Sequence, residues 1–130
     1  MAQKKILVVD DEQDNVEFVK TVLEDTGAQI VSARDGEAGL KAAAAEKPDL
    51  IILDVQMPKK DGLTVFAELK EDKAMRSIPV IMLTGLAERT GIQFDKSDMG
   101  DLVGNEPEAY MDKPIDPDLL LRKVKEILGI

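Results

Sequence analysis

The feature of this sequence that most constrains its fold is a pair of short, unbroken apolar runs, Ile6 to Val9 and Leu50 to Leu53. A strand with one exposed face alternates polar and apolar residues, whereas a continuous run of four is typical of a strand buried on both faces. Such strands occur in parallel sheets that helices cover on each side. The two runs therefore favour an α/β domain.

Further apolar strands alternate with amphipathic stretches along the chain. The other expected strands are Gln29 to Ala33, Pro79 to Leu83 and Ala109 to Met111. Helices are expected at Asp14 to Thr26, at Glu37 to Glu46, around Leu63, Phe66 and Leu69, and after Asp116-Pro117, with Leu120, Val124 and Ile127 on one face and Leu119 and Leu128 flanking it. This alternation implies a parallel sheet with right-handed crossovers. We expect a flavodoxin-like, doubly wound sheet of five strands in the order 2-1-3-4-5, with about five helices.

One stretch, residues 86–108, departs from this alternation at the place where the fourth helix belongs. It holds six acidic and two basic residues, and its helical periodicity is weak. A stretch of this length without regular structure is uncommon inside a compact domain. We expect the fourth-helix region to be irregular or lengthened.

The length of 130 residues fits one domain. No repeat, low-complexity tract or linker divides the chain, so we expect a single domain at residues 1–130 with its core at about residues 4–128. After the last expected helix no residues are left for an output domain, which is a further expectation from the sequence.

The composition removes several classes of chemistry. The chain has no His and no Cys, so it can form neither a Ser-His-Asp triad nor a thiol nucleophile, and it offers no imidazole to a metal. The formal net charge is −9 and the pI is about 4.5, which argues against direct binding of nucleic acids or anionic membranes. No apolar run is long enough for a membrane span or a secretory signal, so we expect a cytoplasmic protein.

Chemically useful residues stand at the ends of four of the expected strands. They are Asp10 and Asp11 after the first, Asp54 after the third, Thr84 at the end of the fourth and Lys113 after the fifth. In an open parallel sheet ligands bind outside the carboxyl ends of the strands, and in this strand order the first and third strands are neighbours. The three carboxylates would then converge, and Mg²⁺ is the cation that such oxygen ligands favour. Lys113 would add a positive charge beside it.

Each of these residues also has a purely structural explanation. Asp10 and Asp11 could cap the following helix, Asp54 could belong to a turn, Thr84 could close a strand, and Lys113 could be a solvated lysine. Taken singly, each explanation is plausible. The four strand ends taken together favour a site.

At this point the sequence resembles the receiver domain of bacterial two-component response regulators, of the stand-alone, single-domain type. The resemblance covers nearly the whole chain and is carried by Ile6 to Glu12, Asp54, Met57-Pro58, Asp61-Gly62, Thr84-Gly85 and Tyr110 to Pro114. It implies a phosphorylation-dependent signalling switch, and not an enzyme with a separate substrate. It further implies that the protein takes part in its own phosphorylation and autodephosphorylation.

The resemblance also implies roles for individual residues. Asp54 would accept a phosphoryl group from a histidine kinase or a histidine phosphotransfer protein. Mg²⁺ would be held by Asp10, Asp11, Asp54 and the backbone carbonyl of Gln56, with Asp11 as a direct ligand and Asp10 acting mostly through water. Thr84, Gly85 and Lys113 would bind the phosphoryl oxygens, Thr84 and Tyr110 would form the switch, and the Lys113–Pro114 bond would be cis. The phosphorylated form would then control a protein target that the sequence does not identify.

One spacing and two residues depart from the family pattern. Thr84 and Lys113 are 29 positions apart, several more than in typical chemotaxis-type receivers, and the additional residues fall in the fourth-helix region. Gln56 and Leu86 occupy positions that influence the lifetime of the phosphoryl group. Gln56 could orient an attacking water, and Leu86 could limit its access.

Other functions remain open from the sequence. Haloacid-dehalogenase-like phosphatases also use a strand-end Asp and Mg²⁺, but they need a second Asp where this chain has Gln56. A nucleotide-binding module is disfavoured because neither glycine-rich phosphate loop is present. A pseudo-receiver that binds partners without phosphorylation is disfavoured because all the expected site residues are present.

Overall fold

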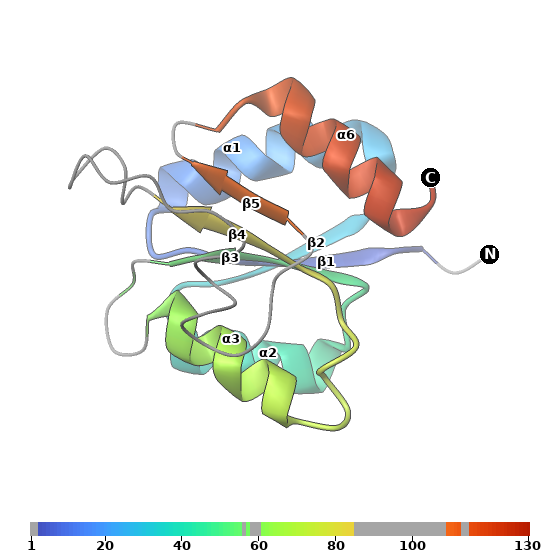
Figure 1. Cartoon of the computed structure of the whole chain (residues 1–130). Coiled ribbons are helices and arrows are strands. Elements are labelled where there is room, and N and C mark those ends of the chain that lie inside the picture. Colours follow the sequence, from blue (N-terminus) through green and yellow to red (C-terminus); the bar gives the residue numbers. More distant parts are fainter. Residues whose placement is uncertain (1–2, 56, 58–60, 85–108, 113–114) are drawn as a thin grey trace.

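A computed structural model describes residues 3–55, 57, 61–84, 109–112 and 115–130 (Figure 1). Five parallel strands form one sheet in the order β2-β1-β3-β4-β5, as the sequence predicts. The strands are β1 (Lys5–Val9), β2 (Gln29–Ala33), β3 (Leu50–Asp54), β4 (Val80–Thr84) and β5 (Ala109–Asp112). The helices are α1 (Gln13–Leu23) with the short 3₁₀ turn η1 (Glu24–Thr26), α2 (Gly36–Glu46), α3 (Gly62–Glu71) and α6 (Pro117–Leu128). The expected fourth helix falls at residues that lie outside the described part.

The sheet lies between two layers of helices, with α1 and α6 on one face and α2 and α3 on the other (Figure 1). Side chains alternate along each central strand between these faces, so that Ile6 and Val8 pack toward α1 and α6 while Leu7 and Val9 pack toward α2 and α3. We call the two groups the α1/α6 core and the α2/α3 core. Because both faces are covered, the two unbroken apolar runs are buried throughout.

Three helices begin at an aspartate whose side chain caps the first turn. Asp35 accepts a hydrogen bond from the amide of Ala38, and Asp61 accepts one from the amide of Thr64, each at 2.8 Å. Asp116 accepts from the amides of residues 118 and 119, and Pro117 follows it as the first residue of α6. An N-cap aspartate satisfies amides that have no partner inside the helix. The expected start of the last helix is thereby confirmed.

The structure corrects two details of the expected helices. The first helix does not continue in α geometry to Thr26, since its last three residues form η1 before Gly27, which has a left-handed φ of 74°. In α6 the fully packed face is Leu120, Val124 and Leu128, which are spaced four residues apart. Ile127 is only partly buried and the Leu119 side chain is 38% exposed. A four-residue spacing keeps side chains on one stripe of a short helix, so Leu128 replaces Ile127 on that stripe.

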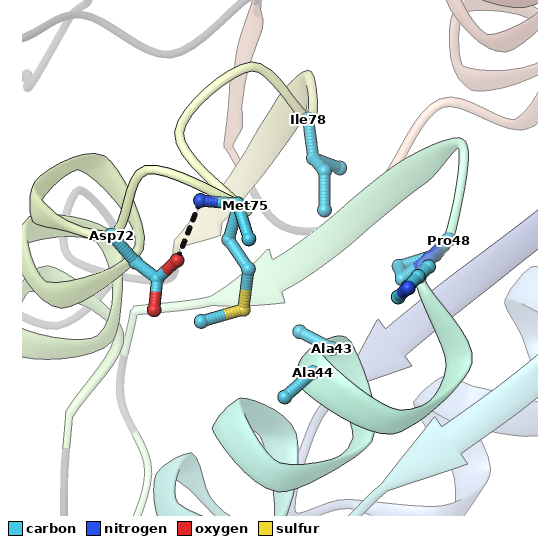
Figure 2. Close-up of a pocket in the computed structure, with 8 residues that line it drawn as sticks. Ala43, Ala44, Pro48, Asp72, Met75 and Ile78 are labelled. Atoms are coloured by element: carbon cyan, nitrogen blue, oxygen red, sulfur yellow. Dashed lines mark hydrogen bonds between the residues drawn. The ribbon is translucent and has the colours of Figure 1, made fainter.

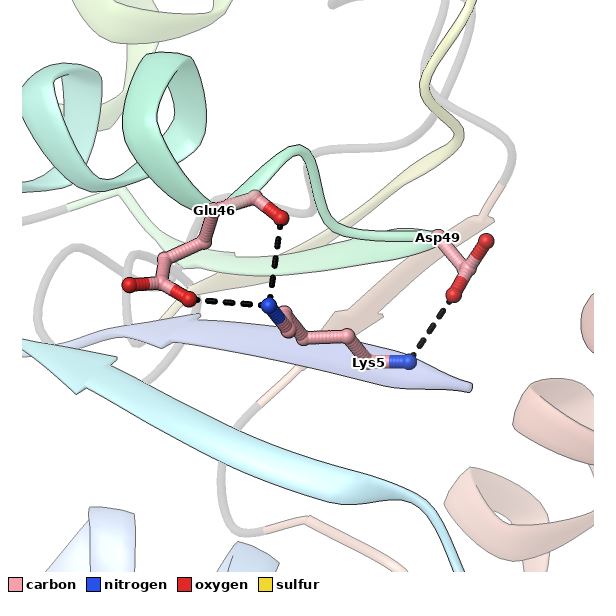
Figure 3. A network of polar contacts seen from close by, with 3 residues as sticks. All are labelled: Lys5, Glu46 and Asp49. Atoms are coloured by element: carbon pink, nitrogen blue, oxygen red, sulfur yellow. Dashed lines mark hydrogen bonds and ion pairs between the residues drawn. The ribbon is translucent and has the colours of Figure 1, made fainter. Parts of the chain in front are cut away.

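The amino ends of the strands lie together at one edge of the sheet. There Lys5 links β1 to the end of α2 and to the start of β3 (Figure 3). Its Nζ donates to Oε1 of Glu46 at 2.9 Å, and its backbone amide donates to Oδ2 of Asp49 at 2.8 Å. This network fixes the start of β1 against the end of α2 and the start of β3. The C-terminal end of α6 also lies at this edge (Figure 1). Among the described helices, none is long and apolar enough to cross a membrane.

Candidate functional site

Asp54 is the last residue of β3, the central strand of the sheet. All five residues of this strand are buried, and Asp54 itself is only 2% exposed. Its backbone is in register with Leu83 of β4, and the next amide, that of Val55, donates to the carbonyl of Leu83 at 2.8 Å. Asp54 therefore belongs to the strand and not to a turn, which removes the structural alternative for this residue. Burial of a carboxylate is costly unless it is paired or hydrogen-bonded, which makes a buried Asp at a strand end a candidate functional residue.

Asp10 follows β1, the strand beside β3. Val9 is in register with Leu53. Asp10 directly follows Val9 and Asp54 directly follows Leu53, so the two acids stand at matching positions of neighbouring strands. Asp10 is 1% exposed, its amide donates to the carbonyl of Ala33 at 3.0 Å, and its Oδ1 accepts from the amide of Glu12 at 2.9 Å. Asp10 is thus anchored to β2 and to the start of the β1–α1 connection.

Three carboxylates meet directly after β1. Oxygen atoms of Asp10, Asp11 and Glu12 lie within 4.8 Å of one another, with Asp10 buried and the other two exposed. The oxygen ligands of octahedral Mg²⁺, each about 2.1 Å from the ion, lie about 3 to 4 Å apart, so these side chains could reach one ion by small rotations. Among the described residues, Asp54 is not part of this group of three. The chemistry of the donors nevertheless fits a hard divalent cation, because all of them are oxygen atoms with negative charge.

Helix capping does not account for these acids. The N-cap of α1 is Glu12, and no side-chain cap hydrogen bond is formed there. The bond that Asp10 accepts comes from the amide of Glu12, which precedes the helix. The structural alternative of helix capping is thereby removed for Asp10 and Asp11.

Glu12 is a further candidate ligand, beyond the site residues expected from the sequence. The signal that could have found it is its place directly after two acids at a strand end, where a tight turn gathers consecutive side chains. Its exposed carboxylate can approach an ion from the solvent side.

The remaining expected site residues are described only in part. The backbone of Thr84 ends β4 beside Asp112, and Tyr110 pairs with Met82 inside β5, so both strands end at the same edge as Asp54. The side chains of Thr84 and Tyr110 lie outside the described part. So do Gln56, Gly85, Leu86, Lys113 and Pro114, with the expected cis bond.

A pocket of about 290 Å³ lies elsewhere, between the C-terminal end of α2 and the loop after α3 (Figure 2). Ala43, Met75 and Ile78 line its apolar side, and the amide of Met75 closes the loop by donating to the carbonyl of Asp72 at 3.1 Å. Pro48 leads from this pocket to the amino end of β3, so the pocket is separated from Asp54 by the length of the strand. Among the described residues that line it, Asp72 is the single carboxylate, and we do not assign the chemistry to this pocket.

Comparison with known proteins identifies the family. Residues 6–125 match the response regulator receiver domain. The alkaline phosphatase synthesis transcriptional regulatory protein PhoP of Bacillus subtilis is 45% identical over 127 residues, which are 96% of this chain and 48% of PhoP. The polar-differentiation response regulator DivK of Brucella anthropi is 32% identical over 126 residues, 97% of each chain. The chain thus spans about half the length of PhoP and nearly all of DivK.

Solved structures agree with this match. The chemotaxis protein CheY4 of Vibrio cholerae superposes with a TM-score of 0.80 at 28% identity, over 97% of this chain and 99% of CheY4. The receiver domain of a Pseudomonas aeruginosa sensor histidine kinase, which holds a magnesium ion coordinated in its active-site cleft, gives a TM-score of 0.81 at 26% identity, over 99% of this chain and 100% of that one. The chain therefore belongs to the receiver-domain family of response regulators, the phosphorylation-dependent switches of two-component signalling.

Proposed function

We propose that this receiver is phosphorylated on Asp54 and that the acids after β1 hold Mg²⁺ beside this residue. The observation that carries the proposal is the placement of a buried carboxylate at the end of the central strand, one strand away from a group of three further carboxylates. A phosphodonor would reach this buried nucleophile from the carboxyl edge of the sheet. Such a placement suits a reaction that depends on positioning the donor.

The donor in this proposal is another protein. A histidine kinase or histidine phosphotransfer protein would supply the phosphoryl group, since this chain has no His. A carboxylate oxygen of Asp54 forms the new bond to phosphorus while the bond from phosphorus to the donor's imidazole nitrogen breaks. That nitrogen keeps the electron pair and remains with the donor. The mixed anhydride on Asp54 is later hydrolysed by water, and Gln56 and Leu86 are the residues we expect to influence its lifetime.

Mg²⁺ would be held by Asp10, Asp11 and Glu12, together with Asp54 and the Gln56 carbonyl. When bound, the ion supplies positive charge that allows an anionic nucleophile to meet an anionic phosphoryl group. The solved relative with magnesium in its active-site cleft supports this assignment. The burial of Asp10 has a separate effect, because it holds one carboxylate in a fixed place while Asp11 and Glu12 remain accessible to solvent.

The residues at the ends of β4 and β5 would recognise the product. Thr84, the Gly85 amide and Lys113 are proposed to bind the phosphoryl oxygens, which fits the approach of their strand ends to Asp54. Movement of Thr84 toward the phosphoryl group would make room for the Tyr110 ring, and the surface around β5 and α6 would change for a protein target. Phosphorylation would in this way shift an equilibrium between two states.

Replacement of Asp54 by Asn tests the acceptor. Asp54→Asn keeps the shape of the side chain and removes the nucleophilic charge, so incubation with acetyl phosphate and Mg²⁺ should add no phosphoryl group to the variant, as measured by intact-protein mass spectrometry. Asp49→Asn is the matched control, because it makes the same change just before the other end of β3 and leaves an oxygen for the Lys5 amide. The control should be labelled like the wild type.

Two results would contradict the proposal. Full labelling of Asp54→Asn would place the acceptor elsewhere, and an unlabelled wild type would favour the pseudo-receiver. Binding of beryllofluoride with Mg²⁺ gives an independent reading, since Tyr110 is the one tyrosine in a chain without Trp. Its fluorescence should change in the wild type and not in Asp54→Asn.

A further inference from the structure

Gly62, the first residue of α3, lies directly against the backbone of Asp54. A Cβ atom at this position would overlap the carbonyl oxygen of Asp54, and it would lie 2.7 Å from Cα of Val55. Real Cβ atoms essentially never come within 3.0 Å of such neighbours. Gly62 is not among the described residues with a positive φ, so the backbone angle would permit another residue. The need for glycine arises from the close approach alone.

The same residue closes the loop that follows the acceptor. The amide of Gly62 donates to the carbonyl of Val55 at 2.8 Å, which joins the residue after Asp54 to the first turn of α3. Beside it, the N-cap Asp61 holds the amide of Thr64. Gln56, whose carbonyl is a proposed metal ligand, lies in sequence between these two anchoring points.

Both partners in this contact are held by other parts of the molecule. On the strand side, the amide of Val55 donates to Leu83 of β4. On the helix side, Val65, Phe66 and Leu69 are at most 1% exposed in the α2/α3 core. The atoms that a side chain at position 62 would meet belong to the backbone, so they cannot rotate away as the end of a side chain can. An added methyl group must therefore displace the backbone of Asp54 or tilt α3.

We infer that Gly62 is a positioning residue for phosphoryl transfer, which sets where the Asp54 carboxylate and the following loop stand relative to the metal ligands. The inference rests on the proposed role of Asp54. Gly62 is not one of the proposed ligands of the ion or of the phosphoryl group. It acts by allowing α3 to pack directly against the backbone of Asp54. A displacement of this kind affects chemistry strongly, since a shift of about 1 Å at a reacting group can lower a rate by about 100-fold.

The test compares Gly62→Ala with Leu69→Ala. Both variants disturb the packing of α3, but Leu69 is near the other end of the helix, where its side chain packs in the α2/α3 core. At a temperature where circular dichroism shows both variants folded, Gly62→Ala should be phosphorylated by acetyl phosphate about 10- to 100-fold more slowly than the wild type at saturating Mg²⁺. It should also bind Mg²⁺ more weakly. Leu69→Ala should keep the wild-type rate and Mg²⁺ affinity while losing stability in urea.

Equal rates and equal Mg²⁺ affinities for the two variants would overturn the inference and leave the role of Asp54 intact. An unlabelled wild type would instead refute the proposed function. If Gly62→Ala does not fold, NMR of the wild-type protein tests the inference. The Gly62 amide should be protected from hydrogen exchange by its bond to Val55, and its resonance should shift when beryllofluoride and Mg²⁺ bind. Rapid exchange or an unshifted resonance would overturn the inference.

Discussion

Adjacent residues can occupy very different surroundings, as Asp10 and Asp11 do. Asp10 is buried and has fixed hydrogen-bond geometry, whereas Asp11 is exposed beside it. An exposed carboxylate within reach of an ion can serve as a direct ligand without a large change in the fold. Removal of its charge should therefore alter metal binding more than stability.

We expect Asp11→Asn to weaken Mg²⁺ binding by about tenfold or more, because one anionic ligand is lost from a group of three. Titration with Mg²⁺ followed by amide NMR measures this change. Asp14→Asn is the control, since it removes the same charge from the first turn of α1, outside the carboxylate group. An equal loss of affinity in both variants would mean that only the overall negative charge attracts the ion.

At this scale the sequence could predict the acids that end strands, because apolar runs locate strand ends and parallel topology brings those ends together. Asp10 and Asp54 are found there as expected. Glu12 had only one signal in the sequence, its place directly after two strand-end acids, because its approach to the other carboxylates depends on the turn after β1. Gly62 was noted only as part of a motif. The close approach that requires a glycine there is a property of the packed backbone.

In α6 the sequence determines where the helix begins, but it does not fully determine which residues are buried. Its start was predictable because Asp116 and Pro117 provide a local signal that does not depend on tertiary structure. Leu120 and Val124 lie on its buried stripe as expected, but the third member is Leu128 and not Ile127, since both are apolar and only tertiary packing decides between them. The α geometry of α1 ends three residues earlier than expected, and β4 is shifted by one residue.

The cap of α6 gives a prediction at the element scale. Asp116→Ala should lower the free energy of unfolding by about 1 kcal/mol, because the side chain accepts from two amides of the first turn. Urea denaturation measures the loss. Asp116→Asn, which retains a capping oxygen, should be close to the wild type, and a loss as large as that of Ala would show that charge and not capping stabilises this end.

The whole molecule contains two apolar cores that the sheet separates. Val19 belongs to the α1/α6 core and Val65 to the α2/α3 core, and each is at most 1% exposed. We expect Val19→Ala and Val65→Ala each to cost about 1 to 3 kcal/mol of stability through lost burial and an unfilled cavity. In the double variant the two losses should add to within about 0.5 kcal/mol, because the two side chains belong to separate cores on opposite faces of the sheet.

Urea denaturation of the wild type, the two single variants and the double variant measures this additivity. A coupling well above that limit would show that the sheet transmits packing changes between the two faces. In a signalling domain such transmission would offer a route from one helical layer to the other.

The location of the two chain ends has a practical consequence. The start of β1 and the C-terminal end of α6 both lie at the amino edge of the sheet, with the length of the strands between them and Asp54 (Figure 1). A dye, an affinity tag or a link to a solid support attached after α6 therefore starts away from the side on which a phosphodonor must dock. Surface-based binding assays and fused reporters can be built from this chain without obstructing that approach.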